Sequence, residues 1–164
     1  MSALRTDASP QLAHRAAPAE GVTVVYSGPL VKGLYDAIHA VQLARIRRVQ
    51  ARLVIDGDGP LAGELRYFST ALKVSDAVWF GPPLLDAADA LLCIDPVDHV
   101  PAAVRRALDC GLRIIAPADC GLGRSLKEGV QAILLASPRP HLICEALVTL
   151  SRSRRLLPGL IERV

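Results

Sequence analysis

The stretch ALLCIDPVDHVPAAVRRALDCGLRIIAP, residues 90–117, contains the pattern of a strand, a helix and a second strand. Its two ends, ALLCID (90–95) and LRIIAP (112–117), are almost continuously apolar, which is typical of strands buried on both faces of a parallel sheet. Between them, Pro101 stands where a helix would begin and Gly111 just past its end, the usual places for these residues. Two strands joined by a helix predict a right-handed crossover and an α/β fold.

The same alternation continues along the chain in both directions. Strands are expected near residues 22–27, 51–56, 76–81, 90–95, 112–116 and 130–135, with helices over 34–50, 61–73 and the 101–110 region, and from about Pro140 to the end, broken near Pro158. This order predicts a doubly wound, six-stranded, mostly parallel Rossmann-like sheet with helices on both faces. Ligands of such sheets bind beyond the carboxyl ends of the strands, near the point where the strand order reverses.

Composition limits the protein class. The chain has 164 residues, of which 51% are hydrophobic and only 4% aromatic, so one domain with an aliphatic core is expected. Residues 1–20 are rich in Ala, Pro and Ser and are expected to form a flexible tail or linker, with the domain covering 21–164. A net charge of +3 is too small to predict a nucleic-acid partner. No apolar run reaches the roughly 20 residues that span a bilayer.

The four cysteines are Cys93, Cys110, Cys120 and Cys144. They contain no CxxC pair, and no cysteine or histidine cluster has the spacing of a zinc site. Free thiols in a reducing compartment are expected, which favours a cytoplasmic location. Neither a metal nor a cofactor is predicted.

Two glycine-containing turns follow the first two strands. In SGPLVKG (27–33), Lys32 stands between glycines at the start of a helix and could hold a phosphate, although the segment is not a P-loop and a plain turn is the alternative. GDGPLAG (57–63) is close to a dinucleotide-binding motif, but it follows the second strand and its third glycine is one position late. A tight turn leading into a helix is therefore the favoured interpretation.

Two later loops also carry polar chemistry. Asp95, Asp98 and His99 follow the fourth strand, where a carboxylate and an imidazole could do acid–base work, but no nucleophile is convincingly placed near them. In ADCGLGRS (118–125), the backbone amides around Gly121 and Gly123 could form an anion-binding nest. Each of these motifs is weak alone.

Their order is more specific. The series YSGPLVKG, ARLVIDGDGPL, VWFGP and ALDCGLRIIAPADCG resembles the C-terminal, donor-binding domain of retaining GT-B glycosyltransferases of the large family 4 type. The resemblance runs from about Val22 to Arg155, and GDGPL and CGLRIIAPADCG are its most specific parts. It implies a nucleotide-sugar donor, with UDP- or GDP-sugars as the expected ligands.

The resemblance also implies which residues would form the donor site: Gly28, Lys32, Asp98, Arg106, Gly121 and Gly123. Lys32 matches the family's lysine for the donor diphosphate, and Asp98 matches the first of two glutamates that hold the sugar and the ribose. Two positions depart from the pattern. Pro29 replaces a diphosphate-binding arginine, and Arg106 replaces the second glutamate, although a guanidinium can only donate hydrogen bonds. The alternative for Arg105 and Arg106 is a solvated helix face.

These departures predict an impaired donor site, and no catalytic residue is assigned. A GT-B enzyme also needs an N-terminal acceptor domain, so the chain is expected to act with a separate acceptor-domain polypeptide or as a homodimer that uses Leu156 to Val164. Independent catalysis is not expected. The alternatives are a non-catalytic interaction or anion-binding module descended from a glycosyltransferase, and a plain nucleotide-binding module unrelated to sugar transfer.

Overall fold

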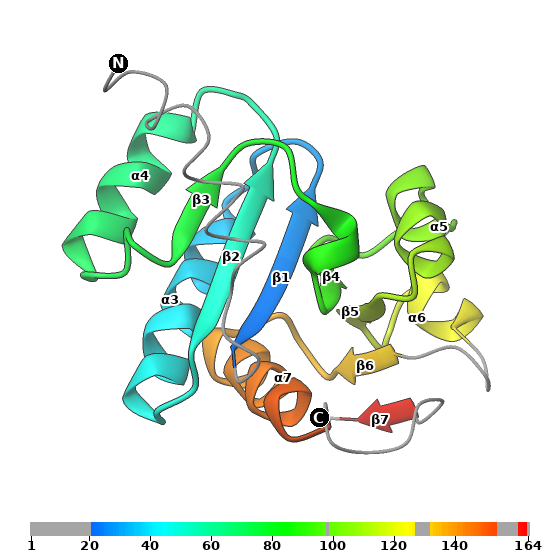
Figure 1. The fold of residues 1–164 in the computed structure, drawn as a ribbon. Coiled ribbons are helices and arrows are strands. Elements are labelled where there is room, and N and C mark those ends of the chain that lie inside the picture. Colours follow the sequence, from blue (N-terminus) through cyan, green and yellow to red (C-terminus); the bar gives the residue numbers. More distant parts are fainter. Residues whose placement is uncertain (1–20, 98, 127–131, 154–160, 164) are drawn as a thin grey trace.

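The structure is a computed structural model that describes residues 21–97, 99–126, 132–153 and 161–163. Helices cover both faces of a single twisted sheet (Figure 1). The elements in chain order are β1 (Val22–Ser27), α3 (Gly33–Ile46), β2 (Ala51–Asp56), α4 (Ala62–Ala71), β3 (Val78–Phe80), the 3-10 turn η1 (Leu85–Ala87), β4 (Ala90–Leu92), α5 (Ala102–Asp109), β5 (Arg113–Pro117), α6 (Gly121–Ser125), β6 (Ala132–Leu135), α7 (Pro140–Ser153) and β7 (Ile161–Arg163).

The strand order confirms a doubly wound parallel sheet. The strands lie in the order β3-β2-β1-β4-β5-β6-β7, and every pair of neighbours is parallel. The chain first moves outward from β1 to β3 and then crosses back to β4 on the other side of β1. The strand order therefore reverses between β1 and β4, and the crevice for a ligand is expected at the carboxyl ends of these two strands.

The six predicted strands are confirmed, although β3 and β4 are shorter than expected. The expectation that the chain stays helical from Pro140 to its end is wrong, because α7 is followed by the short strand β7, which pairs with β6. A strand at this place satisfies hydrogen-bonding groups that the edge of β6 would otherwise present. The predicted tail (1–20) and most of the proposed dimerisation segment (156–160 and 164) lie outside the described residues, so these expectations stay predictions.

Two apolar cores lie on opposite faces of the sheet. One packs α3, α4 and α7 against inward residues such as Val24, Leu53 and Ile133. The other packs α5 and α6 against residues such as Val25, Leu91 and Ile114. Because alternate residues of a strand point to opposite faces, a strand covered on both sides must be apolar throughout, as residues 90–92 and 113–117 almost are.

The start and stop signals of α5 act as the sequence predicts. Pro101 occupies the N-cap position, and Gly111 follows the last turn with a φ of 78°, a conformation that glycine adopts without steric cost. The Gly111 and Leu112 amides donate to the carbonyls of Leu108 and Ala107 at 3.0 and 2.9 Å. These two bonds close the helix end and lead directly into β5.

The helix predicted over 34–50 ends earlier, at Ile46. Arg48 follows with a φ of 61°, and the Val49 amide donates to the Ala44 carbonyl at 2.9 Å. Lys73 takes the same conformation after α4, with a φ of 60°. Both helices therefore end in a left-handed residue of the kind that is usually glycine.

Candidate functional site

The loops after β1, β4 and β5 converge at the carboxyl edge of the sheet. Gly33, at the start of α3, is so close to the end of β4 that a Cβ atom there would lie 2.3 Å from Cγ2 of Ile94. The Leu122 amide, at the start of α6, donates to the Val97 carbonyl at 2.7 Å. Packing and hydrogen bonding therefore hold the three loops together at the point where the strand order reverses.

Hydrogen bonds and a close backbone contact hold the loop after β1 in place. The Tyr26 hydroxyl donates to the Pro29 carbonyl at 2.5 Å, and the Gly28 amide donates to the Asp56 carbonyl at 3.0 Å. A Cβ atom on Gly57 would lie 2.0 Å from the Gly28 carbonyl oxygen, so the loops after β1 and β2 are in backbone contact. Gly28 itself has a φ of 150°, which other residues rarely adopt. The conformation of this loop therefore depends on Gly28, and its contact with the loop after β2 depends on Gly57.

Lys32 is the last residue of this loop and directly precedes the 14-residue helix α3. Its backbone occupies the N-cap position of the helix, its carbonyl accepts from the Tyr35 amide at 3.0 Å, and the residue is exposed. The Leu34 amide likewise donates to the Val31 carbonyl at 3.1 Å, so these two amides are already bonded, and it is the partial positive charge of the helix start that favours a bound anion. Lys32 is exposed at this position, so its positive charge can add to that attraction.

Tyr26 is a feature of this crevice that the sequence analysis missed. Its side chain is 5% exposed, and burial, the Asp95 carboxylate and the Cys93 thiol together raise its pKa to about 12. The phenol therefore stays neutral and can donate a hydrogen bond at any physiological pH. Tyr26 is the only aromatic residue of β1, and its place near the end of this mostly aliphatic strand was the signal for it in the sequence.

The loop after β4 contains the suggested acid–base residues. Asp95 and His99 are both exposed, and the described part of the loop has no hydrogen bond between them. Burial raises the pKa of the neighbouring Cys93 thiol to about 12, with a smaller contribution from Cys120, so Cys93 is a poor nucleophile at neutral pH. Asp98, the residue matched to sugar binding, lies outside the described residues, and its role stays a prediction.

Arg105 and Arg106 lie on the exposed face of α5, whose other face buries Val104 and Ala107. The described residues show no ion pair or hydrogen bond for either guanidinium group. Arg106 is in the last turn of the helix, where a cation also complements the helix dipole. A solvated face and a ligand-facing arginine are both compatible with this placement.

The glycine-rich segment forms the short helix α6, which is capped by a thiol. The Cys120 Sγ accepts from the Gly123 amide at 3.3 Å and donates to the Pro117 carbonyl at 3.2 Å. Gly123 is buried, and a Cβ atom there would lie 2.2 Å from the Pro117 carbonyl oxygen. The geometry gives Gly123 a packing role, and of the two glycines Gly121 is the better placed for an anion.

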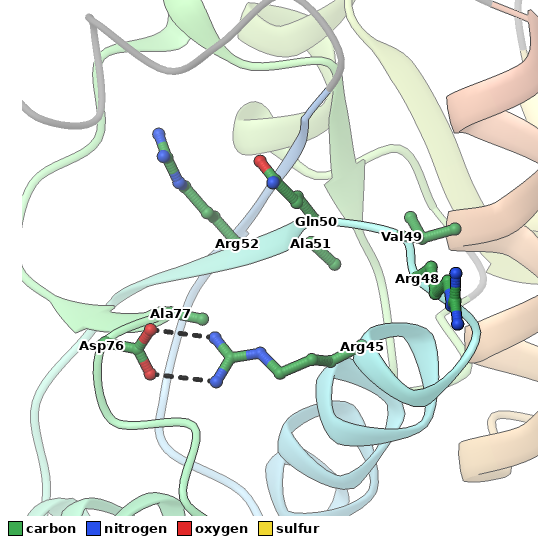
Figure 2. A pocket seen from close by; sticks show the side chains of 8 residues that line it. All are labelled: Arg45, Arg48, Val49, Gln50, Ala51, Arg52, Asp76 and Ala77. Carbon is green, nitrogen blue, oxygen red and sulfur yellow. Dashed lines mark hydrogen bonds and ion pairs between the residues drawn. The ribbon is translucent and has the colours of Figure 1, made fainter.

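A pocket of about 450 Å³ lies at the opposite, amino edge of the sheet. It is lined by Arg45, Arg48, Val49, Gln50, Ala51, Arg52, Asp76 and Ala77. Figure 2 shows Arg45 turned toward Asp76, with which it forms a bidentate ion pair at 3.0 and 3.1 Å. This pair lowers the pKa of the Asp76 carboxyl. No motif singled out in the sequence contributes to this pocket.

The remaining features concern the cysteines, metal ligands and membrane-spanning helices. Cys93, Cys110, Cys120 and Cys144 are all free thiols. Within the described ranges, no three His, Cys, Asp or Glu side chains gather as metal ligands would. In the same part of the chain, no helix has both the length and the apolar character to cross a membrane.

Solved structures share this fold. Over 94% of the chain and 42% of the other protein, it matches a glycosyltransferase from Rickettsia africae with a TM-score of 0.69 and 8% identity. It matches HepE from Anabaena, solved with UDP and glucose, over 84% of the chain and 40% of HepE, with a TM-score of 0.66 and 20% identity. It also matches the C-terminal domain of LpcC, a group 1 glycosyl transferase from Francisella tularensis, over 89% of the chain and 84% of that domain, with a TM-score of 0.67 and 16% identity.

The fold is that of a GT-B C-terminal half domain. This confirms the fold expected from the resemblance. The chain spans about two fifths of the first two proteins and most of the isolated LpcC domain. No protein-family model and no curated protein sequence matches it. At these identities the comparison establishes the half-domain architecture, and the activity has to be argued from the residues of the site.

Proposed function

We propose that this GT-B half domain is the donor-binding part of a glycosyltransferase-like system and that it holds the diphosphate of a nucleotide sugar at the β1/β4 crevice. The observation that carries the proposal is the position of Lys32, exposed at the head of α3 and beside the switch point of the sheet. A single cation on a helix start suits a diphosphate, which carries its charge on oxygens that accept several hydrogen bonds.

The loop after β1 supports this assignment. Gly28 and Gly57 bring the backbones of two loops into contact, and Gly33 lets α3 begin directly against Ile94. A ligand at this edge can therefore approach main-chain groups closely. Gly121 completes the proposed phosphate contacts, since the Gly123 amide is already bonded to Cys120. Asp98 keeps its proposed role toward the sugar.

The same site is proposed to be weakened relative to a full donor site. Pro29 cannot supply the charge-assisted bonds of an arginine, and Arg106 cannot accept bonds from ribose hydroxyls. Each such bond contributes about 1.5–3 kcal/mol, so losing two groups of contacts lowers the affinity by several orders of magnitude. We therefore propose weak donor binding, and transfer only together with an acceptor half-domain, supplied by a separate polypeptide or within a larger assembly.

Calorimetric titration with UDP- and GDP-sugars tests the proposal. The natural protein is expected to bind one of them in the high-micromolar range, and Lys32→Ala is expected to abolish the measurable heat. Lys73→Ala, which removes a lysine at the other edge of the sheet, is the matched control and should leave binding unchanged. If Lys32→Ala binds as well as the natural protein, the diphosphate is not held at this loop and the proposal is wrong.

The Pro29→Arg, Arg106→Glu double variant tests the reason for the weak binding. Restoring the arginine and the glutamate of the donor pattern should tighten nucleotide-sugar binding at least tenfold. Tight binding by the natural protein that is lost in Arg106→Glu would instead identify Arg106 as a ligand-holding residue of an intact site.

The exposed Arg106 favours a second candidate, a general anion-binding module derived from the same fold. Such a module needs charge but no ribose contact. Inorganic phosphate would then compete with the nucleotide sugar at similar concentration, and added salt would weaken binding strongly. Competition by UDP but not by phosphate would exclude this candidate.

A further inference from the structure

We propose that Tyr26 is a positioning residue of the donor site, whose hydroxyl group fixes the loop after β1 and thereby holds Lys32 in place for the diphosphate. This role rests on the proposed function, in which Lys32 binds the diphosphate. The bond that carries it is the one that the Tyr26 hydroxyl donates to the Pro29 carbonyl at 2.5 Å. Pro29 lies three residues before Lys32, so the bond acts close to the group that it positions.

The ring of Tyr26 belongs to the core, whereas its hydroxyl group belongs to the loop. The residue is 5% exposed and packs in the apolar core that β1 shares with α3, α4 and α7. A phenylalanine would fill nearly the same space, and a buried hydroxyl group is costly unless it has a hydrogen-bond partner. Its partner is a main-chain carbonyl of the loop. The hydroxyl group therefore ties the loop to the strand that precedes it.

The residues between the strand and Lys32 make this single bond effective. The ring of Pro29 fixes its φ at about −65° and leaves it no amide group, so the carbonyl bound by Tyr26 is its only polar main-chain group. Gly28 is the flexible residue of the loop, and its amide donates to the Asp56 carbonyl at 3.0 Å. A Cβ atom on Gly28 would lie 3.4 Å from the Tyr26 hydroxyl oxygen, so the end of the ring also lies against this part of the loop.

The rest of the loop is held as far as the side chain of Lys32. Leu30 is 8% exposed and packs in the same core as Tyr26. The Val31 carbonyl accepts a bond from the amide of residue 34, and the Lys32 carbonyl accepts one from the amide of residue 35. The described residues show no ion pair or hydrogen bond for the ammonium group of Lys32. A fixed main chain thus presents a charge that is available to a ligand.

A fixed loop favours binding because a mobile one has to be ordered when the ligand arrives, which lowers the affinity. The lysine side chain is itself flexible, so the position of its main chain limits how much order the ligand must impose. The bond from Tyr26 is also present at every physiological pH. Burial above all, together with the Asp95 carboxylate and the Cys93 thiol, raises the pKa of Tyr26 to about 12, and the phenol keeps the proton that it donates.

Tyr26→Phe tests this role, because it removes the hydroxyl group and keeps the ring. Two NMR measurements follow the loop without a ligand: the carbonyl carbon shift of Pro29, and the order parameters of the Val31 and Lys32 amides. We expect the Pro29 signal to move upfield as its carbonyl loses the bond, and the order parameters to fall from about 0.85 toward 0.6. Titration with UDP should then show binding about fivefold weaker than in the natural protein, as the loss of one hydrogen bond implies.

Tyr35→Phe is the matched control. It removes the same hydroxyl group from a residue one turn after Lys32, but this hydroxyl donates to the Glu64 carboxylate at 2.7 Å and does not touch the loop. The control should leave the loop and the UDP affinity unchanged. Pro29→Gly is a second test, since it keeps the carbonyl that Tyr26 binds but removes the ring that fixes φ. It should also lower the order parameters and weaken UDP binding.

A role in the core alone predicts that Tyr26→Phe lowers the melting temperature while the loop and the affinity stay as they are, and that result overturns the proposal. Equal losses of affinity in Tyr26→Phe and Tyr35→Phe overturn it as well. If Tyr26→Phe does not fold, Pro29→Gly decides by the same measurements. Failure of the proposed function looks different: the natural protein does not bind UDP, whereas the Pro29 signal and the order parameters still respond to Tyr26→Phe and support the hold of Tyr26 on the loop.

Discussion

Substituting Gly33 by alanine tests the contact that forms the β1/β4 crevice. The added Cβ atom would lie 2.3 Å from Cγ2 of Ile94, where ordinary contact begins at 3.4 Å, so the two atoms must separate by about 1 Å. Ile94 is only 4% exposed, and its branched Cβ leaves few rotamers into which Cγ2 could turn. Overpacking of this kind costs about 1–3 kcal/mol.

Alanine is also a better helix former than glycine by up to about 1 kcal/mol, which offsets part of that cost. Gly33→Ala is therefore expected to lower the free energy of unfolding by about 1–2 kcal/mol. Gly63→Ala is the matched control, since Gly63 also lies in the first turn of a helix but has no atom within 4 Å of the added Cβ. That variant should gain about 0.5–1 kcal/mol.

Urea unfolding followed by circular dichroism measures both variants. The same substitution is also measured in the Ile94→Ala variant, which lacks the obstructing methyl group. There, adding Gly33→Ala should leave the free energy of unfolding unchanged or raise it. The reasoning is refuted if Gly33→Ala stabilises the protein as much as Gly63→Ala does, or if its cost persists unchanged in the Ile94→Ala background.

Two further predictions concern the same edge. Cys120→Ala should lower the free energy of unfolding by about 0.5–2 kcal/mol through loss of the thiol that caps α6, whereas Cys120→Ser, which keeps an acceptor for the Gly123 amide, should lose less, as measured by urea unfolding. The pKa of Tyr26 is about 12 in the fold and 10.0 ordinarily, so the folded state keeps the phenol proton and the unfolding free energy should fall as pH rises from 10 toward 12. Tyr26→Phe should flatten that decline, and an unchanged slope in denaturation measured across this pH range would count against the burial of the phenol.

The sheet could be predicted from the sequence because its signals are local. Apolar runs of five or six residues, with Pro101 and Gly111 marking a helix between two of them, are enough to place strands and order a crossover. The seventh strand could not be predicted, since residues 161–163 are too few to show a period and their state is decided by the open edge of β6. Local pattern and tertiary pairing compete there, and pairing prevails.

The candidate site was only partly visible in the sequence. Lys32 and the glycines stand in recognisable turns, whereas the buried Tyr26 hydroxyl and the thiol cap at Cys120 depend on contacts that no spacing encodes.

The central claim is that a nucleotide sugar binds at the β1/β4 crevice through the loop that carries Lys32. Titrating the isotope-labelled protein with UDP and following backbone amide shifts by NMR measures this directly. We predict that the shifts concentrate at residues 27–34, in the loop after β4 and at Gly121, and that they vanish in Lys32→Ala. Shifts confined to the pocket at the amino edge of the sheet, or shifts at the crevice that persist at full size in Lys32→Ala, would contradict it.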